Sequence, residues 1–195
     1  MNTERAQVGW GFWLWWVLAT FVGSAVGVVV GVAVLGPVLG AVGLAGAGVM
    51  QWLVLRQQLS RSGWWILASS VGLAIGLVVG VAASAAGGDD AAVVSLPVLG
   101  ASVGIAQWRV LRRQVSRAGW WILVNVVGLA VGLAATLVVF GVADGSGGGA
   151  VTGALEDAIF GAVIGAVVGA ITGAVMVWML RQPAAKELGP SQAAE

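Results

Sequence analysis

The sequence contains no cysteine and no histidine, and only 9% of its 195 residues are charged. Without thiols or imidazoles, the chain has no disulfides, thiol nucleophiles, zinc sites of the usual kind, His-ligated haem or imidazole general bases. Nucleotide-binding loops, zinc helices, catalytic triads and calcium loops are missing as well. The formal net charge of +1 excludes nucleic-acid binding that depends on a strongly positive net charge. We therefore expect no catalytic residues, no metal and no cofactor.

What the sequence does contain is apolar: 59% of the residues are hydrophobic, without counting 32 glycines. Soluble domains carry roughly 25% charged residues, so this composition indicates a membrane protein. The apolar runs are continuous and lack the alternation of a membrane barrel, which favours helices over strands. The sequence predicts an all-α integral membrane protein with six transmembrane helices: Trp10–Leu35, Val38–Leu55, Trp64–Ala86, Ala91–Leu111, Trp120–Val142 and Asp157–Leu180.

With six spans, all nine cations fall on one side of the membrane: Arg5, Arg56, Arg61, Arg109, Arg112, Arg113, Arg117, Arg181 and Lys186. The positive-inside rule assigns that side to the cytoplasm, with both termini there. The opposite face receives Gly36-Pro37, the Gly87–Asp90 turn and the segment Asp144–Gly149. The first span is too long and too rich in tryptophan for a signal peptide, so we expect an uncleaved anchor.

An internal repeat divides the chain, because residues 108–123 reproduce the pattern of residues 52–67. A third, partial copy is visible in Trp15-Trp16, which matches Trp64-Trp65 and Trp120-Trp121, and in Trp178–Arg181 at the end of the last span. We expect three helical hairpins at 10–62, 63–118 and 119–182, between cytoplasmic tails 1–9 and 183–195. Each hairpin contains two spans, so the copies are parallel and related by an axis along the membrane normal.

Two short motifs recur in this repeat. Gln-Trp-x-x-Leu-Arg stands at Gln51–Arg56 and Gln107–Arg112, and Gly-Trp-Trp-Ile-Leu at Gly63–Leu67 and Gly119–Leu123. The pattern resembles a group of uncharacterised bacterial polytopic membrane proteins that are rich in glycine and tryptophan. The resemblance implies a location in the bacterial inner membrane, and it implies no particular activity. Mitochondrial carriers also have three two-helix repeats, but their Pro-x-acid-x-x-base signature is missing after every span here.

Glycines four residues apart place small surfaces on one helical face and allow close helix packing, as in a glycine zipper. We expect packing within the monomer, with packing against a second subunit or a backbone-lined pore as alternatives. The helix-packing candidates are Gly23, Gly27, Gly31, Gly72, Gly76, Gly80, Gly128, Gly132, Gly161, Gly165, Gly169 and Gly173.

All eleven tryptophans fall near the predicted cytoplasmic helix ends, which indicates a one-sided tryptophan belt in the headgroup region. A pigment- or partner-binding role is the alternative. Arg109, Arg112, Arg113 and Arg117 fall at helical spacing if the fourth helix continues past the membrane surface and ends at Gly119. They suit anionic lipid phosphates, or they determine topology alone. The lipid or partner rim is predicted to contain Arg56, Arg61, Arg109, Arg112, Arg113, Arg117, Trp52, Trp64, Trp65, Trp108, Trp120 and Trp121.

Polar side chains within the spans are few. Thr20, Ser69 and Asn125 occupy equivalent repeat positions, and Gln51 and Gln107 precede equivalent tryptophans. We expect interhelical hydrogen bonds from them, with a ligand role for Asn125 as the alternative. Glu156 and Asp157 are expected at the outer interface, because an acid at membrane depth is costly and usually functional.

These features predict a non-enzymatic structural or accessory subunit that oligomerises or packs into a larger membrane complex. The expected partners are membrane lipids with anionic headgroups and either a protein partner or further copies of the chain, and no nucleic acid. The alternative is a small-solute channel or transporter, although polar residues in the spans are sparse. Lipid or pigment binding is a further alternative, and an intramembrane enzyme is poorly supported because no nucleophile and base can be paired.

Overall fold

The computed structural model describes residues 9–35, 45–59, 62–87, 91–115, 117–142 and 150–182. Within these ranges the chain forms six helices and no strand, so the predicted all-α fold is confirmed. The helices are α1 (Trp10–Leu35), α2 (Ala45–Leu55), α3 (Trp64–Gly87), α4 (Ala91–Leu111), α5 (Trp120–Val142) and α6 (Ala150–Arg181).

The predicted bounds hold for α1, α4 and α5, and α3 extends one residue further, to Gly87. The predicted start of the last helix at Asp157 is wrong, because α6 begins at Ala150. Glutamate is a good helix former and Glu156 is exposed, so its charge remains solvated inside the helix. The first part of the predicted second helix, together with Gly36-Pro37, lies outside the described residues, as does the segment Asp144–Gly149.

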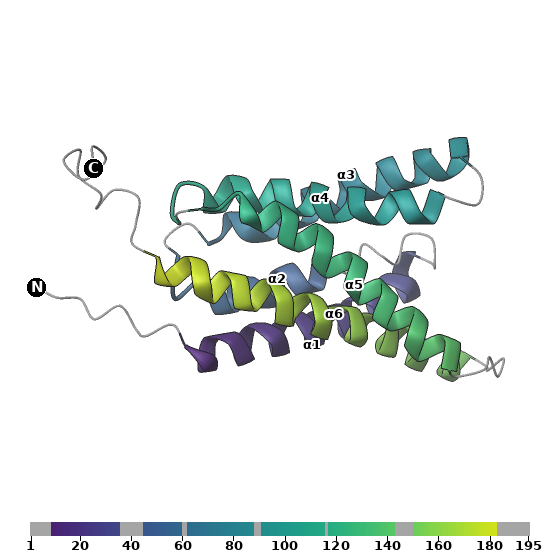
Figure 1. Cartoon of the computed structure of the whole chain (residues 1–195). Coiled ribbons are helices and arrows are strands. Elements are labelled where there is room, and N and C mark those ends of the chain that lie inside the picture. The colour runs from purple at the N-terminus through teal and green to yellow at the C-terminus, as the bar shows by residue number, and fades with distance from the viewer. Residues whose placement is uncertain are drawn as a thin grey trace, which may run out of the picture.

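The six helices form a closed ring in chain order. Each helix packs mainly against its neighbours in sequence, and α6 closes the ring by packing against α1. In Figure 1 the helices run along a common direction, and the start of α1 lies at the same end of the bundle as the end of α6. The ends of α2 and α4 and the starts of α3 and α5 lie at that end too, so neighbouring helices are antiparallel.

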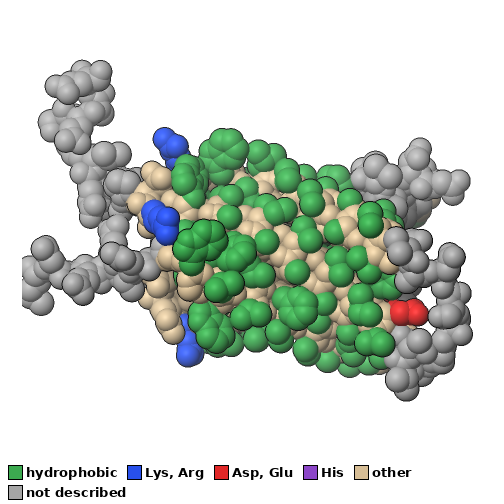
Figure 2. Space-filling view, turned by 60° about the horizontal axis from the view of Figure 1, so that its bottom comes forward, with side chains coloured by type: hydrophobic (Ala, Val, Ile, Leu, Met, Phe, Trp, Pro, Cys, Tyr) green, Lys and Arg blue, Asp and Glu red, His purple; other side chains and the backbone are tan. Residues whose placement is uncertain are grey.

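Four of the helices are long and apolar enough to cross a membrane: Trp10–Val34, Trp64–Ala83, Trp120–Phe140 and Gly153–Arg181. Their outer faces carry large apolar side chains, and Val26, Val30 and Val34 of α1 are all exposed. Figure 2 shows hydrophobic side chains covering the flank of the bundle. Soluble monomers rarely expose so much contiguous apolar surface, so the flank indicates a membrane protein whose sides contact lipid.

Glycine brings neighbouring backbones together at several helix contacts. A Cβ atom on Gly23 would lie 2.7 Å from Ala47 Cα of α2, and one on Gly72 would lie 2.7 Å from Val103 Cα of α4. These distances are too short for any side chain, so both helix pairs depend on glycine. The remaining ladder glycines of α1 and α3 are buried or half-buried: Gly27, Gly31, Gly76 and Gly80.

The glycine ladder of α6 faces α1 within the same chain. A Cβ on Gly165 would lie 2.6 Å from the Thr20 carbonyl oxygen, and Gly161, Gly169 and Gly173 meet α1 in the same way. This face is therefore occupied, and the alternative that it packs against a second subunit is wrong. The contact between α5 and α6 is wider, because a Cβ on Gly128 would lie 3.7 Å from Val168 Cα.

Candidate functional site

The two members of each tryptophan pair point in opposite directions. Successive residues of a helix are about 100° apart, so only one of two neighbours can face the bundle interior. The second members, Trp16, Trp65 and Trp121, are at most 1% exposed, whereas the first members, Trp15, Trp64 and Trp120, are at least 54% exposed. The prediction that Trp65 and Trp121 belong to the lipid or partner rim is therefore wrong, while Trp64 and Trp120 do lie on the surface.

The three buried tryptophans, here called the tryptophan triad, meet at the centre of the ring. The ring centroids are 6.0 Å apart for Trp16 and Trp65, 6.1 Å for Trp16 and Trp121, and 5.6 Å for Trp65 and Trp121, all in edge-to-face contact. Leu55, Leu111, Met176 and Met179 complete this buried cluster. The triad and its neighbours close the interior of the bundle at the end where α1 begins.

Gln51 of α2 joins the two helices on either side of it. Its Oε1 accepts a hydrogen bond from Trp65 Nε1 of α3 at 3.1 Å, and its Nε2 donates to Thr20 Oγ1 of α1 at 3.1 Å. The Thr20 hydroxyl in turn donates to the Trp16 carbonyl oxygen of its own helix at 2.8 Å. One side chain thus connects α1, α2 and α3 through buried polar contacts.

Gln107 of α4 makes the same contacts between α3 and α5. Its Oε1 accepts from Trp121 Nε1 at 2.8 Å, and its Nε2 donates to Ser69 Oγ at 2.8 Å. Ser69 donates to the Trp65 carbonyl oxygen at 2.9 Å, as Thr20 does to that of Trp16. The interhelical hydrogen bonds predicted for Gln51, Gln107 and their hydroxyl partners are confirmed. The same prediction for Asn125 is wrong, because its amide donates to the Trp121 carbonyl oxygen of its own helix.

At the third corresponding position, α6 has a threonine that the sequence analysis did not single out. Thr172 Oγ1 accepts from Trp16 Nε1 at 3.0 Å and donates to the Val168 carbonyl oxygen at 2.6 Å. Aligning the repeat on Trp178 hides this residue. Aligning the repeat on its fully buried side chains reveals it. Thr172 precedes the buried Met176 by the same interval at which Gln51 precedes the buried Leu55.

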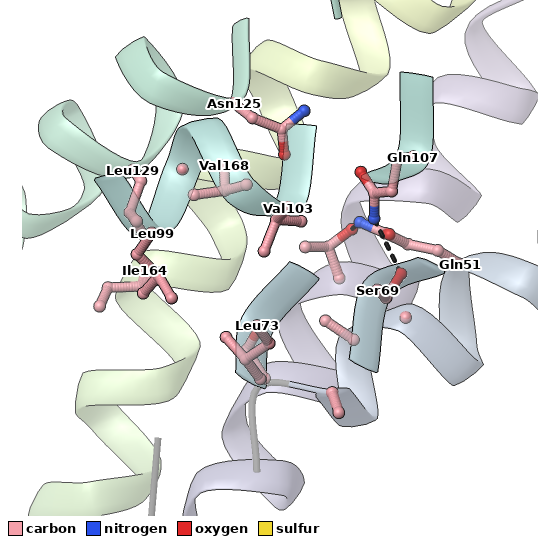
Figure 3. A pocket seen from close by; sticks show the side chains of 16 residues that line it. Gln51, Ser69, Leu73, Leu99, Val103, Gln107, Asn125, Leu129, Ile164 and Val168 are labelled. Atoms are coloured by element: carbon pink, nitrogen blue, oxygen red, sulfur yellow. Dashed lines mark hydrogen bonds between the residues drawn. The ribbon is translucent and has the colours of Figure 1, made fainter. Parts of the chain in front are cut away.

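A cavity of about 90 Å³ lies beside this hydrogen-bond network and is lined by side chains from all six helices. Figure 3 shows Gln51, Ser69, Gln107 and Asn125 on one side of it and Leu73, Leu99, Leu129 and Ile164 on the other. The lining holds amide, hydroxyl and aliphatic groups and, among the described residues, no charged side chain. Such groups can hydrogen-bond a neutral molecule, but they do not ionise near neutral pH.

The fourth helix ends at Leu111 as predicted, and the conditional extension through Arg117 to a cap at Gly119 does not occur. The Leu111 carbonyl oxygen accepts from the backbone N–H groups of Gln114 at 2.8 Å and Val115 at 3.0 Å, which ends the helix in a turn. Arg117, with a φ of 56°, takes the left-handed conformation expected of Gly119. Because Leu111 and Ala118 are both buried, the chain must turn back toward the bundle between them.

Three of the rim arginines lie over tryptophan rings. The guanidinium carbon is 5.8 Å from the ring centroid for Arg56 and Trp52, 5.1 Å for Arg112 and Trp108, and 5.6 Å for Arg117 and Trp178. These distances fit cation–π contacts. Arg56, Arg109, Arg112, Arg113 and Arg117 are exposed, Trp52 and Trp108 are half-buried, and Arg61 lies outside the described residues.

We find no family model, no curated protein and no solved structure that matches this chain. The resemblance to bacterial glycine- and tryptophan-rich proteins stays a prediction. Function is therefore inferred from the chain's own residues and their contacts.

Proposed function

We propose that the chain is a non-enzymatic, multi-pass protein of the bacterial inner membrane that serves as a structural or accessory subunit of a larger membrane assembly. In this proposal six spans form three parallel hairpin repeats, and both termini are cytoplasmic. The observation that carries the proposal is the closed interior. The tryptophan triad blocks one end of the bundle, and every fully buried side-chain nitrogen or oxygen among the described residues has a hydrogen-bond partner.

The lengths of α2 and α4 support six spans. At 1.5 Å per residue, the 21 residues of α4 extend about 31 Å, which matches a hydrocarbon core about 30 Å thick. The described part of α2 is shorter, with 11 residues, and the charge-free residues 36–44 precede it in the sequence. The predicted span Val38–Leu55 falls within the range of about 17–25 residues that a bilayer requires.

The distribution of charge supports the orientation. Figure 2 shows arginine or lysine side chains at one end of the bundle and acidic surface at the opposite end. Between Glu156 and Arg181, α6 rises about 37 Å, which exceeds the thickness of the hydrocarbon core. With Arg181 at the cytoplasmic interface, Glu156 reaches the outer one, as its exposure requires.

The contacts around Gln51 and Gln107 support the repeat. The turns that follow them also correspond, because the Leu55 carbonyl oxygen accepts from Gln58 N at 2.8 Å and from Leu59 N at 2.9 Å, as that of Leu111 does in the next hairpin. Two hairpins thus share side-chain and backbone hydrogen bonds. The third uses Thr172 in place of glutamine.

A small-solute channel or transporter is the second candidate, and the central cavity favours it. Conduction requires a path through the tryptophan triad. Opening that path would separate three edge-to-face aromatic contacts, each worth about 0.5–1.5 kcal/mol beyond its burial, and would break the indole hydrogen bonds. This cost favours the structural subunit over an open channel.

The exposed rim supplies the interaction surface of the proposed subunit. Its arginines suit anionic lipid phosphates, and its outward tryptophans suit the headgroup region or a partner helix. We expect gentle purification followed by native mass spectrometry to recover a stoichiometric protein partner or a homo-oligomer with anionic lipid bound. Replacing Arg109, Arg112, Arg113 and Arg117 together with glutamine should release the lipid or the partner. A monomer that retains neither before the substitution would refute the subunit proposal.

A further inference from the structure

Each even-numbered helix can connect its two neighbours by hydrogen bonds near the tryptophan triad. This connection is complete for α2 and α4 and incomplete for α6. Gln51 links α1 to α3 and Gln107 links α3 to α5, in each case through an amide that donates to a hydroxyl one helix back. Thr172 accepts from Trp16 but donates its single proton to Val168 in its own helix. Asn125 of α5 therefore receives no donor from α6, although it stands where the other hairpins have Thr20 and Ser69.

Asn125 has an unused acceptor that faces the cavity. Its Nδ2 donates to the Trp121 carbonyl oxygen at 2.8 Å, which fixes the orientation of the amide. No described residue donates to its Oδ1, and Figure 3 shows this oxygen pointing into the pocket, away from the nitrogen. Among the described residues, every fully enclosed side-chain oxygen has a hydrogen-bond partner. Oδ1 has none, so it is not fully enclosed and must border open space, although Asn125 as a whole is only 8% exposed.

The helices of the third hairpin pack less closely at this level than those of the second. A Cβ on Gly128 would lie 3.7 Å from the Cα of α6 that it faces, against 2.7 Å for the equivalent Gly72 and its α4 neighbour. The cavity, at about 90 Å³, exceeds the roughly 10–15 Å³ that one water needs. Ser24 of α1, which is buried and donates to no described residue, lines it as well.

The lining decides which ligand chemistry fits. No charged described residue borders the cavity, so an ion would lose its hydration without gaining a counter-charge. The lining offers Asn125 Oδ1 and the Ser24 hydroxyl as polar groups, and Leu73, Leu99, Leu129 and Ile164 as apolar ones. This combination fits a compact apolar body that carries one hydrogen-bond donor.

We propose that the cavity is a binding site for a small neutral alcohol, whose hydroxyl donates to Asn125 Oδ1 while its apolar body contacts the leucine and isoleucine side chains. This site goes beyond the proposed subunit function and does not depend on it. The acceptor is available only because α6 has threonine where α2 and α4 have glutamine.

The proposal can be tested by titrating the full-length protein in detergent with cyclopentanol and with cyclopentane, which lacks the hydroxyl. The indole N–H resonance of Trp121, whose carbonyl contacts Asn125, reports occupancy, and that of exposed Trp120 reports partition into the detergent. We expect a saturable shift at Trp121 with a Kd about tenfold lower for cyclopentanol, since its hydroxyl satisfies a buried acceptor. Equal affinities for the two compounds, or shifts at Trp120 alone, would overturn the proposal.

Two variants separate binding from folding. In Thr172→Gln the longer amide reaches Asn125 Oδ1, so cyclopentanol binding should be lost while the midpoint of thermal unfolding rises. Asn125→Leu should abolish the preference for cyclopentanol over cyclopentane, and it decides the matter if Thr172→Gln does not fold. Thr136→Val is the matched control, because this buried α5 hydroxyl bonds to the Gly132 carbonyl oxygen away from the cavity lining and should leave binding unchanged. Wild-type affinity in folded Thr172→Gln or Asn125→Leu would exclude the site.

Discussion

Gln107 Nε2 of α4 donates to Ser69 Oγ of α3 at 2.8 Å. The same hydrogen bond forms one hairpin earlier, where Gln51 of α2 donates to Thr20 of α1. Each glutamine also accepts from the indole of a buried tryptophan in the following odd-numbered helix. Both amide ends are thus used in the apolar interior, where an unpaired polar group is costly. The repeated sequence motif thus corresponds to a repeated set of hydrogen bonds between helices.

Replacing Gln107 with leucine should destabilise the bundle, because Trp121 Nε1 and Ser69 Oγ lose their shared partner. Leaving a buried donor unpaired costs about 1–3 kcal/mol. Thermal unfolding in detergent measures the change. Gln57→Leu alters an exposed glutamine of the same type and should stay within about 0.5 kcal/mol of the wild type. Equal stabilities for the two variants would contradict the claim that the hydrogen bonds of Gln107 stabilise the bundle.

Tryptophan fluorescence in bilayers with brominated acyl chains should distinguish the two members of a pair. Trp120 is exposed on the flank and should be quenched, whereas Trp121 is enclosed by the triad and should be protected. Trp120→Phe should therefore lower the quenched fraction, and Trp121→Phe should raise it. The reverse order would mean that the helix is rotated relative to this structure.

Gly165→Ala should lower the unfolding midpoint, because the added methyl group would lie 2.6 Å from the Thr20 carbonyl oxygen of α1. Overpacking of this kind costs about 1–3 kcal/mol. Gly153→Ala, in the same helix, meets nothing within 4 Å and should be neutral or stabilising, since alanine favours helices. A Gly165→Ala protein as stable as Gly153→Ala would show that α6 does not pack closely on α1.

The topology can be tested with single cysteines, because the chain has none of its own. Glu156→Cys should react with an impermeant thiol reagent added to intact cells whose outer envelope has been made permeable. Gln57→Cys should react only after lysis. Both positions are exposed, so accessibility is controlled by the membrane side alone. Labelling of Gln57→Cys in intact cells would reverse the orientation.

The sequence predicted the helices well where a long uncharged apolar run follows a polar segment. Trp10–Leu35 and Trp120–Val142 are correct at both ends, since uninterrupted apolar runs of that length have few alternatives. The rotation of each helix was not predictable. In α5 apolar residues surround the helix on all sides, so no amphipathic pattern shows that Trp121 faces inward and Trp120 outward.

The candidate site was visible only in part. Thr20, Ser69 and Asn125 were recognised as equivalent, and so were Gln51 and Gln107, because the repeat conserves their spacing. Thr172 was missed because it replaces glutamine and because Trp178 suggested a different alignment. The free acceptor at Asn125 depends on that single replacement, which does not follow from motif spacing.

Solute flux into liposomes tests most directly whether the tryptophan triad seals the bundle. Liposomes that contain the purified protein should take up glycerol no faster than empty liposomes, as followed by stopped-flow light scattering. Trp65→Ala, which removes one of the three rings, provides a comparison with a weakened seal. Glycerol uptake by wild-type liposomes well above that of empty ones would contradict the closed interior and would favour the channel.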